Sequence, residues 1–170
     1  WFAGANFSTV MTIFDSLGQG HDLTYLFRKT ATANQWEVRV AANAGDITGG
    51  TAGMLQQVDT AGGLLAFNPD GTLDTATTNI TDIGPIAWAD GSNAQTVLAA
   101  DMDFTGTTQF ALASSVSLQN QNGSQSGILK GISIGTDGVI TGQFTSGGNQ
   151  PLFRIALADF ANPRGLAHVG

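Results

Sequence analysis

Short apolar runs closed by turn residues recur along this chain, and they constrain its fold more than any other feature. One run ends at Gly18 and another begins at Leu157. Such runs are rich in β-branched and aromatic residues, and Gly, Asn or Asp separates them, which is typical of antiparallel strands joined by turns. Long helical periodicity is absent. Strands are expected at residues 7–14, 23–29, 36–40, 64–67, 80–86, 96–99, 128–134, 139–144 and 153–158, and a short strand or turn at 54–58.

The clearest break in composition is residues 119–127, nine polar or glycine residues without an apolar side chain. Such a stretch indicates a connection between domains. We therefore expect an all-β chain in two parts. Residues 1–118 would form an antiparallel, barrel-like or sandwich-like domain, and residues 119–170 a short hairpin-rich segment of a second domain.

Charge and cysteine content exclude several classes of protein. The chain has no cysteine, so disulfides, thiolate metal sites and cysteine nucleophiles are excluded. Its 13 acidic and 6 basic residues give a net charge of −7, and the basic residues form no stripe that could follow a phosphate backbone. We expect no nucleic-acid binding, no membrane binding and no cofactor.

The ends of the sequence indicate an excised fragment. The chain opens at Trp1 without a methionine, and no signal peptide is visible. No run approaches the roughly 20 apolar residues of a membrane span.

Catalytic arrangements have little support. Asp15, Ser16, His21 and Asp22 lie close in sequence, but residues crowded onto one hairpin rarely supply a catalytic triad. The favoured interpretation is that Asp15 and Ser16 shape the turn, while His21 and Asp22 lie at its exposed end. No catalytic residue is predicted.

A calcium loop is the most serious site hypothesis. Asp101 and Asp103 stand two apart and Gly106 is at the sixth position, as in the opening of a D-x-D-x-x-G loop. The twelfth position is Leu112 where a bidentate acid belongs. A solvated loop with two turn-forming aspartates is favoured, and the two residues stay weak metal candidates.

The tryptophans divide between core and surface roles. Trp36 alternates with valines, which favours the core. Trp88 is compatible with a carbohydrate platform or an interface anchor, but core packing is the favoured interpretation.

Several short sequence segments between residues 10 and 166 resemble segments of the bacterial flagellar hook proteins and related axial proteins of the flagellum, and they occur in the same order as in that family. They are Phe14-Asp-Ser-Leu-Gly18, residues 21–30, Trp36-Glu-Val38, Phe67-Asn-Pro-Asp-Gly-Thr-Leu73, Gln119-Asn-Gln-Asn-Gly123, Asp137-Gly-Val139 and Phe160-Ala-Asn-Pro-Arg-Gly-Leu166. The turn and strand residues that carry the resemblance are Asp15, Ser16, Gly18, Asn68, Asp70, Gly71, Asp137, Gly138, Phe160, Asn162, Pro163, Gly165 and Leu166.

The resemblance implies a structural subunit that assembles with copies of itself and other axial proteins into a curved, flexible tube, which transmits torque from motor to filament. It implies an extracellular flagellar location, export without a cleaved signal peptide, and no enzymatic activity. Residues 1–118 would be the outer inserted β-domain and residues 119–170 the returning part of the domain nearer the tube. The fragment alone is expected to be monomeric.

Three alternatives stay open at this stage. One is a secreted carbohydrate-binding or adhesive β-domain that uses Trp88, with calcium at Asp101 and Asp103. Another is a β-rich hydrolase with a cleft at His21. The last is a sister axial protein of the rod or a junction.

Overall fold

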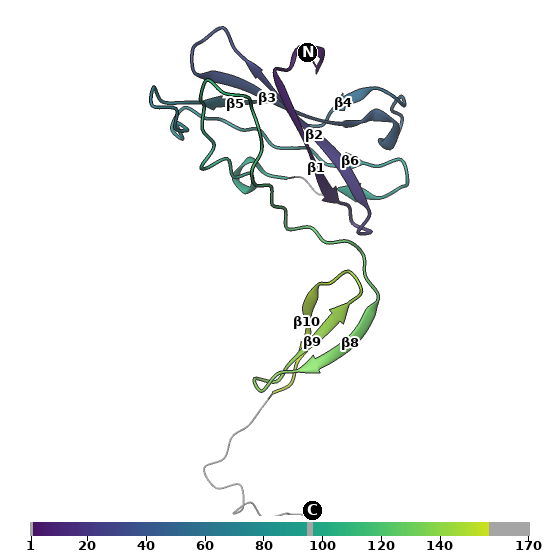
Figure 1. The fold of residues 1–170 in the computed structure, drawn as a ribbon. Helices are drawn as coiled ribbons and strands as arrows, with labels where there is room; N and C mark the ends of the chain where they lie inside the picture. The colour runs from purple at the N-terminus through teal and green to yellow at the C-terminus, as the bar shows by residue number, and fades with distance from the viewer. Residues whose placement is uncertain (1, 95–96, 157–170) are drawn as a thin grey trace, which may run out of the picture. The chain divides into compact units, whose positions relative to one another are not determined.

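The computed structural model describes residues 2–94 and 97–156, which form two compact units that divide between residues 123 and 124. We call residues 2–123 the N-terminal unit and residues 124–156 the C-terminal unit. Figure 1 shows that both units consist of strands joined by loops. Each is described by itself.

One five-stranded sheet forms the framework of the N-terminal unit. Its strands are β1 (Phe7–Phe14), β2 (Gly20–Lys29), β3 (Gln35–Asn43), β4 (Leu55–Gln57) and β5 (Gly63–Ala66). The order is β1-β2-β3-β4, β5 also pairs with β3, and every pair is antiparallel. The predicted strand at residues 7–14 coincides with β1, and the predicted strands at 23–29, 36–40 and 64–67 overlap β2, β3 and β5.

The rest of this unit is mostly irregular. A small sheet joins β6 (Ile86–Ala87) to β7 (Asn93–Ala94), and three single turns of 3-10 helix lie at Phe2–Gly4, Ala44–Asp46 and Ala99–Asp101. The predicted strand at residues 80–86 is wrong over most of its length, since Ile83 makes only isolated bridges to Asp59 and Val97. The strand predicted at 96–99 falls partly outside the described residues, and its described part is the Val97 bridge and the last helical turn.

One face of the large sheet carries the core. Leu23 lies opposite Ala42, and the two pack with Val40, Ile83 and Trp88 in one buried cluster. Trp88, predicted as a core residue, is 1% exposed. Irregular segments therefore cover a regular sheet, because they bring apolar side chains onto the face that period-2 alternation makes hydrophobic.

A second buried cluster continues this face along the sheet. Val38, Leu65 and Phe67 are buried, and Trp36 is partly buried against them. The indole N–H of Trp36 donates a hydrogen bond to the Gln109 side-chain oxygen at 2.7 Å. The expectation of a core role for Trp36 thus holds, with its polar end satisfied.

The C-terminal unit is a three-stranded meander. Its strands are β8 (Leu129–Ile134), β9 (Val139–Phe144) and β10 (Asn149–Arg154), in the order β10-β9-β8. The predicted strands at 128–134 and 139–144 match β8 and β9. The third strand starts at Asn149, four residues before its predicted start, and the end of the prediction lies outside the described residues. Pro151 is tolerated because β10 is an edge strand.

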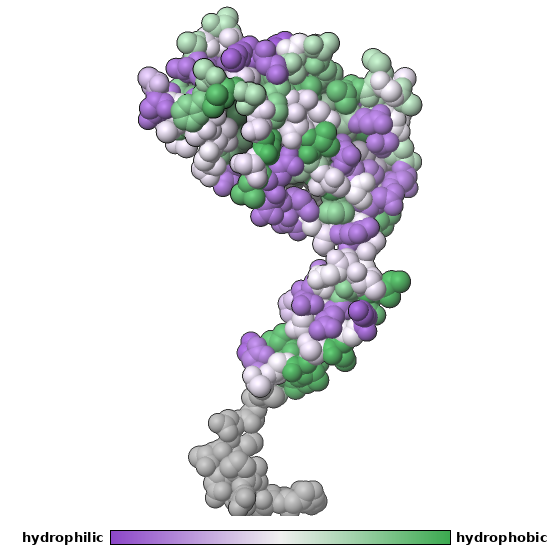
Figure 2. Space-filling model, in the orientation of Figure 1, coloured by the Kyte–Doolittle hydropathy of each residue, from purple (hydrophilic) through white to green (hydrophobic). Residues whose placement is uncertain are grey.

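Apolar side chains of this meander are exposed. Ile134, Ile140 and Phe153 stand opposite one another across the three strands, and Ile132 lies on the same face, two residues before Ile134. Phe153 is 73% exposed, Ile132 63% and Ile134 61%. Figure 2 shows apolar residues on the surface of this unit. Ile140, on the central strand, is partly buried.

The predicted all-β, antiparallel fold class is confirmed, since the helical content of residues 2–94 and 97–156 is three single 3-10 turns. Within the described residues, no helix is long and apolar enough to cross a membrane.

Candidate functional site

The turn between β1 and β2 is built around the carboxylate of Asp15. One oxygen, Oδ1, accepts hydrogen bonds from the backbone N–H groups of Leu17 and Gln19, each at 2.8 Å. The Gly18 N–H donates to the Asp15 carbonyl at 3.0 Å. The side chain of Asp15 is fully buried, and the adjacent Ser16 lies exposed in the turn. Asp15 and Ser16 therefore lie in the hairpin turn, as the sequence indicated.

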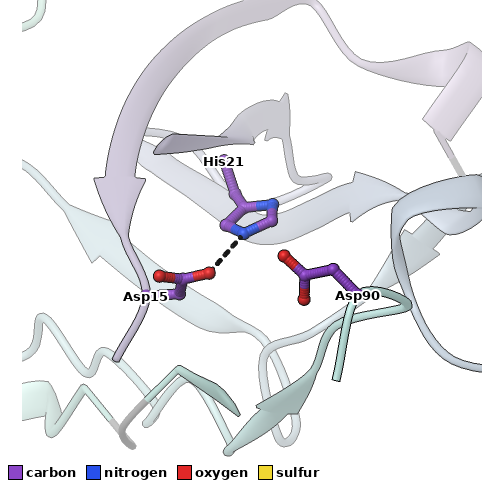
Figure 3. Close-up of side chains that lie close together, drawn as sticks. All are labelled: Asp15, His21 and Asp90. Atoms are coloured by element: carbon purple, nitrogen blue, oxygen red, sulfur yellow. Dashed lines mark hydrogen bonds and ion pairs between the residues drawn. The ribbon is translucent and has the colours of Figure 1, made fainter. Parts of the chain in front are cut away.

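A second turn, 77 residues away in the chain, meets the first. The other Asp15 oxygen, Oδ2, is 2.5 Å from the Ser92 hydroxyl and 3.0 Å from Nε2 of His21. The same hydroxyl lies 2.7 Å from Oδ1 of Asp90. We call Asp15, His21, Asp90 and Ser92 the Asp15 cluster, and Figure 3 shows three of its members converging.

His21 is not exposed, and its predicted place at the open end of the hairpin is wrong. Its side chain is 11% exposed and its ring stacks on Trp88, with centroids 3.8 Å apart and planes 3° from parallel. Asp22, by contrast, is exposed as expected. Sequence alternation missed the position of His21 because Trp88 comes from a distant, irregular segment.

The Asp15 cluster has the wrong connectivity for a catalytic triad. In a triad the histidine bridges the serine and the acid, so that it can take the serine proton. Here the acid, Asp15, bridges Ser92 and His21. Burial alone raises the pKa of Asp15, but hydrogen bonds from Ser92, Gln19, His21 and Leu17 hold this pKa well below its usual range. Such a carboxylate is a poor general base at neutral pH.

Three side chains of the Asp15 cluster lie close enough together to hold a metal ion. One ligand atom each from Asp15, His21 and Asp90 lies within 4.8 Å of the others. The carboxylates already accept hydrogen bonds from Ser92 and from backbone N–H groups. The arrangement joins two turns, and we assign it a structural role.

A recurrent local pattern explains part of this arrangement. In Asp90-Gly-Ser92, Asp70-Gly-Thr72 and Asp103-Phe-Thr105, Oδ1 of the aspartate lies within hydrogen-bond distance of both the backbone N–H and the hydroxyl two residues on. The hydroxyl of the Ser or Thr is the main cause that lowers the pKa of Asp70, Asp90 and Asp103. The Asp-x-Ser/Thr spacing is visible in the sequence, but the meeting of Asp15 with Ser92 is not.

The weak calcium candidates lie in this kind of turn. Asp101 ends the last 3-10 turn, and Asp103 is the acceptor of its own turn through Thr105. Both are exposed, and neither belongs to a group of three potential ligands in the described residues.

The remaining motif residues mostly lie in turns. Asn68, Asp70 and Gly71 form the turn after β5, where the Gly71 N–H donates to the Asn68 carbonyl at 2.9 Å. Asp137 and Gly138 join β8 to β9. Phe160, Asn162, Pro163, Gly165 and Leu166 lie outside the described residues.

Comparison with known proteins gives a consistent result. Residues 3–124 match the family described as the flagellar basal body protein FlaE D2 domain. The chain is 32% identical over 171 residues to the flagellar hook protein FlgE of Helicobacter pylori, and 32% identical over 162 residues to that of Salmonella typhimurium. These alignments cover 99% and 94% of this chain but only 23% and 36% of the two relatives.

Solved structures of flagellar hook proteins share the fold. A 32 kDa fragment of FlgE from Caulobacter crescentus is similar with a TM-score of 0.51 and 26% identity, over 69% of this chain and 46% of the fragment. Helicobacter pylori FlgE2 is similar with a TM-score of 0.54 and 21% identity, over 96% of this chain and 35% of that protein. The chain thus spans about a quarter to a half of the proteins it matches.

Proposed function

The chain belongs to the flagellar basal body protein FlaE D2 domain family, and we propose that it is part of a structural subunit of the bacterial flagellar hook. The observation that carries this proposal is the match of residues 3–124, almost the whole N-terminal unit, to that family. The subunit would assemble with copies of itself and with other axial proteins into a flexible extracellular tube. Export without a cleaved signal peptide is part of the same proposal.

The physical character of the N-terminal unit supports a structural role. Its buried carboxylate Asp15 joins two turns and has a pKa unsuited to general base catalysis at neutral pH. Its surface turns are closed by aspartates that bond to neighbouring Ser and Thr residues. We propose that the chain is no enzyme, and that weak polar contacts between such surfaces allow subunits to slide as the tube bends.

We assign the two parts of the chain different places in the subunit. Residues 1–118 would be the outer inserted β-domain, and residues 119–170 the returning part of the domain nearer the tube. The two compact units divide between residues 123 and 124, and the family match ends at residue 124, which supports a boundary close to residue 118.

The exposed face of the C-terminal unit supports its assignment to an incomplete domain. A three-stranded sheet needs a covered hydrophobic face for independent stability. Ile132, Ile134 and Phe153 are more than half exposed, whereas most of the length of the relatives lies outside the aligned region. We propose that parts of the subunit outside this sequence cover this face. Without them, we expect the fragment to be monomeric at low concentration.

The test is a segment exchange in Helicobacter pylori. The segment of its hook protein that aligns with this chain is replaced by this chain, in a strain that makes no other hook subunit. Hooks seen by electron microscopy and restored motility are the expected result, and re-insertion of the native segment is the control. An exported, protease-resistant hybrid that forms no hooks would contradict the proposal.

The carbohydrate-binding alternative is not favoured by the structure. A platform needs an exposed aromatic face, and Trp88 is 1% exposed beneath the stack with His21. We expect no heat of binding from a glycan panel or from calcium in calorimetry.

A further inference from the structure

The outer edge of β1 is an open strand edge. β1 ends the sheet order, and among the described residues no backbone hydrogen bond joins its eight residues to any segment except β2. The strand Phe7–Phe14 contains no charge and no proline, and its register with β2 has no shift. It therefore lacks the devices that usually prevent an edge from accepting another strand.

A second segment of the same unit has the pattern of a strand without a partner. Large apolar side chains stand at Phe110, Leu112, Val116 and Leu118, an alternation interrupted at Ser114, and their exposure runs from 43% to 83%. This alternation is typical of a strand. In the structure, residues 112–123 belong to no strand and make no backbone–backbone hydrogen bond among the described residues.

These two unpaired segments lie side by side. The Gln119 side-chain N–H donates to the Thr9 hydroxyl at 2.8 Å. Further along both, a Cβ placed on Gly123 would lie 3.4 Å from Cβ of Phe14. Both contacts indicate that the segment runs parallel to β1, and that each of its residues lies about 110 positions further along the chain than the β1 residue beside it. Thr9 and Phe14 point to opposite faces of the sheet by alternation, so the segment follows the edge of β1 and not one face.

We propose that residues 116–123 dock on β1 as an additional parallel strand, with Thr9 opposite Gln119. The occupant of the edge is this chain's own segment, which already lies beside it. Residues 119–123 have no apolar side chain to hold them, so the pairing is reversible. Docking would shorten the unpaired segment that connects the two units. The proposal does not depend on whether the chain assembles into a hook.

The absence of cysteine makes a disulfide test clean. The variant Thr12→Cys/Asn122→Cys places a pair in the proposed register, since 12 and 122 keep the same offset. The matched control Ser8→Cys/Asn122→Cys is four residues out of register, about 13 Å along a strand. We expect the in-register pair to form its intramolecular disulfide at least tenfold faster in the 170-residue chain.

Hydrogen exchange gives an independent readout that needs no new bond. In the unmodified chain, alternate amides of residues 117–122 should exchange at least tenfold slower than in an unstructured peptide. Leu118→Pro should abolish this protection, and Ser126→Pro, beyond the paired segment, should not. Equal disulfide rates in the two cysteine pairs, or exchange of residues 117–122 at unstructured rates, would overturn the proposal. Disulfide-linked dimers, or protection of β1 that rises with protein concentration, would overturn it in favour of a second copy at the edge.

Discussion

The two units use the same antiparallel strand chemistry but differ in what covers their sheets. In the N-terminal unit, segments far from β2 and β3 in sequence bring Ile83, Ile86 and Trp88 onto the sheet face. In the C-terminal unit, Ile134 and Phe153 flank the partly buried Ile140 on one face of the sheet, and both are more than half exposed. Local alternation and turns are thus enough to form a meander. A buried core forms only where segments distant in sequence pack onto the face of the sheet.

The same contrast extends to the turns. The β1–β2 turn is tied to the Asp90–Ser92 turn through the Asp15 cluster. The turn at Asp137 is closed by bonds within it, including one from the Val139 N–H to the Asp137 side chain at 3.1 Å. Its further backbone bond, from the Ile155 N–H to the Gly138 carbonyl at 2.8 Å, reaches only the residue that follows β10 in the same meander. Turns that hold distant parts of the chain together should therefore be more sensitive to substitution than turns that only reverse direction.

The largest expected difference between the units comes from removing one large apolar side chain from each. Trp88→Ala should lower the free energy of unfolding of the N-terminal unit by about 4 kcal/mol, because it leaves a cavity under His21. Trp36 stays in this unit, partly buried against its second cluster, so its fluorescence reports the unfolding of the unit in urea. Phe153→Ala, the matched truncation in the C-terminal unit, should change the free energy of unfolding of its own meander by less than about 0.5 kcal/mol, measured by hydrogen exchange. Comparable losses would contradict the contrast.

The next effect tests the link between the two turns. Asp15→Asn should cost the N-terminal unit about 3 kcal/mol, because a buried charged acceptor of several hydrogen bonds is lost and an amide N–H faces their donors. Asp22→Asn, at an exposed carboxylate seven residues on, is the matched control and should cost less than about 0.5 kcal/mol. Urea unfolding at pH 7 measures both variants. A similar cost for the two would mean that the Asp15 cluster is an incidental contact.

The sequence could predict most strands and the local turns, because their signals are local. Alternation located β1 and β9 to the residue, and Pro69-Asp-Gly71 marked its turn. It predicted the core positions of Trp36 and Trp88 but could not predict burial in general, since Phe153 and Leu23 stand in equally strand-like runs and only Leu23 is covered. It placed His21 at the surface for the same reason. The meeting of Asp15 with Ser92 depends on a contact across 77 residues, for which the chain carries no local sign.

A smaller effect separates a packed turn from an open one. Gly71 has a φ of +87°, and an added Cβ would lie 2.5 Å from the Gln109 carbonyl oxygen. Gly147 has a φ of +85°, but its Cβ would meet nothing within 4 Å. Gly71→Ala should therefore cost the N-terminal unit about 2 kcal/mol, and Gly147→Ala should cost the C-terminal unit about 1 kcal/mol from backbone strain alone. Equal costs, measured by hydrogen exchange in each unit, would show that strain and not packing sets the cost.

The smallest expected effect lies in the acid response of the N-terminal unit. The pKa of Asp70 is lowered, first by the Thr72 hydroxyl and then by the Thr72 N–H. A lowered folded pKa gives stability that is complete above the unfolded value, about 3.9, and is lost as pH falls through the folded pKa. Asp70→Asn keeps the acceptor but not the charge. It should leave the urea midpoint at pH 7 nearly unchanged and reduce the fall of this midpoint as the pH drops below about 4. Thr72→Val, which removes the larger cause of the shift, should also reduce that fall, and an unaltered acid response in both variants would show that this turn does not contribute to it.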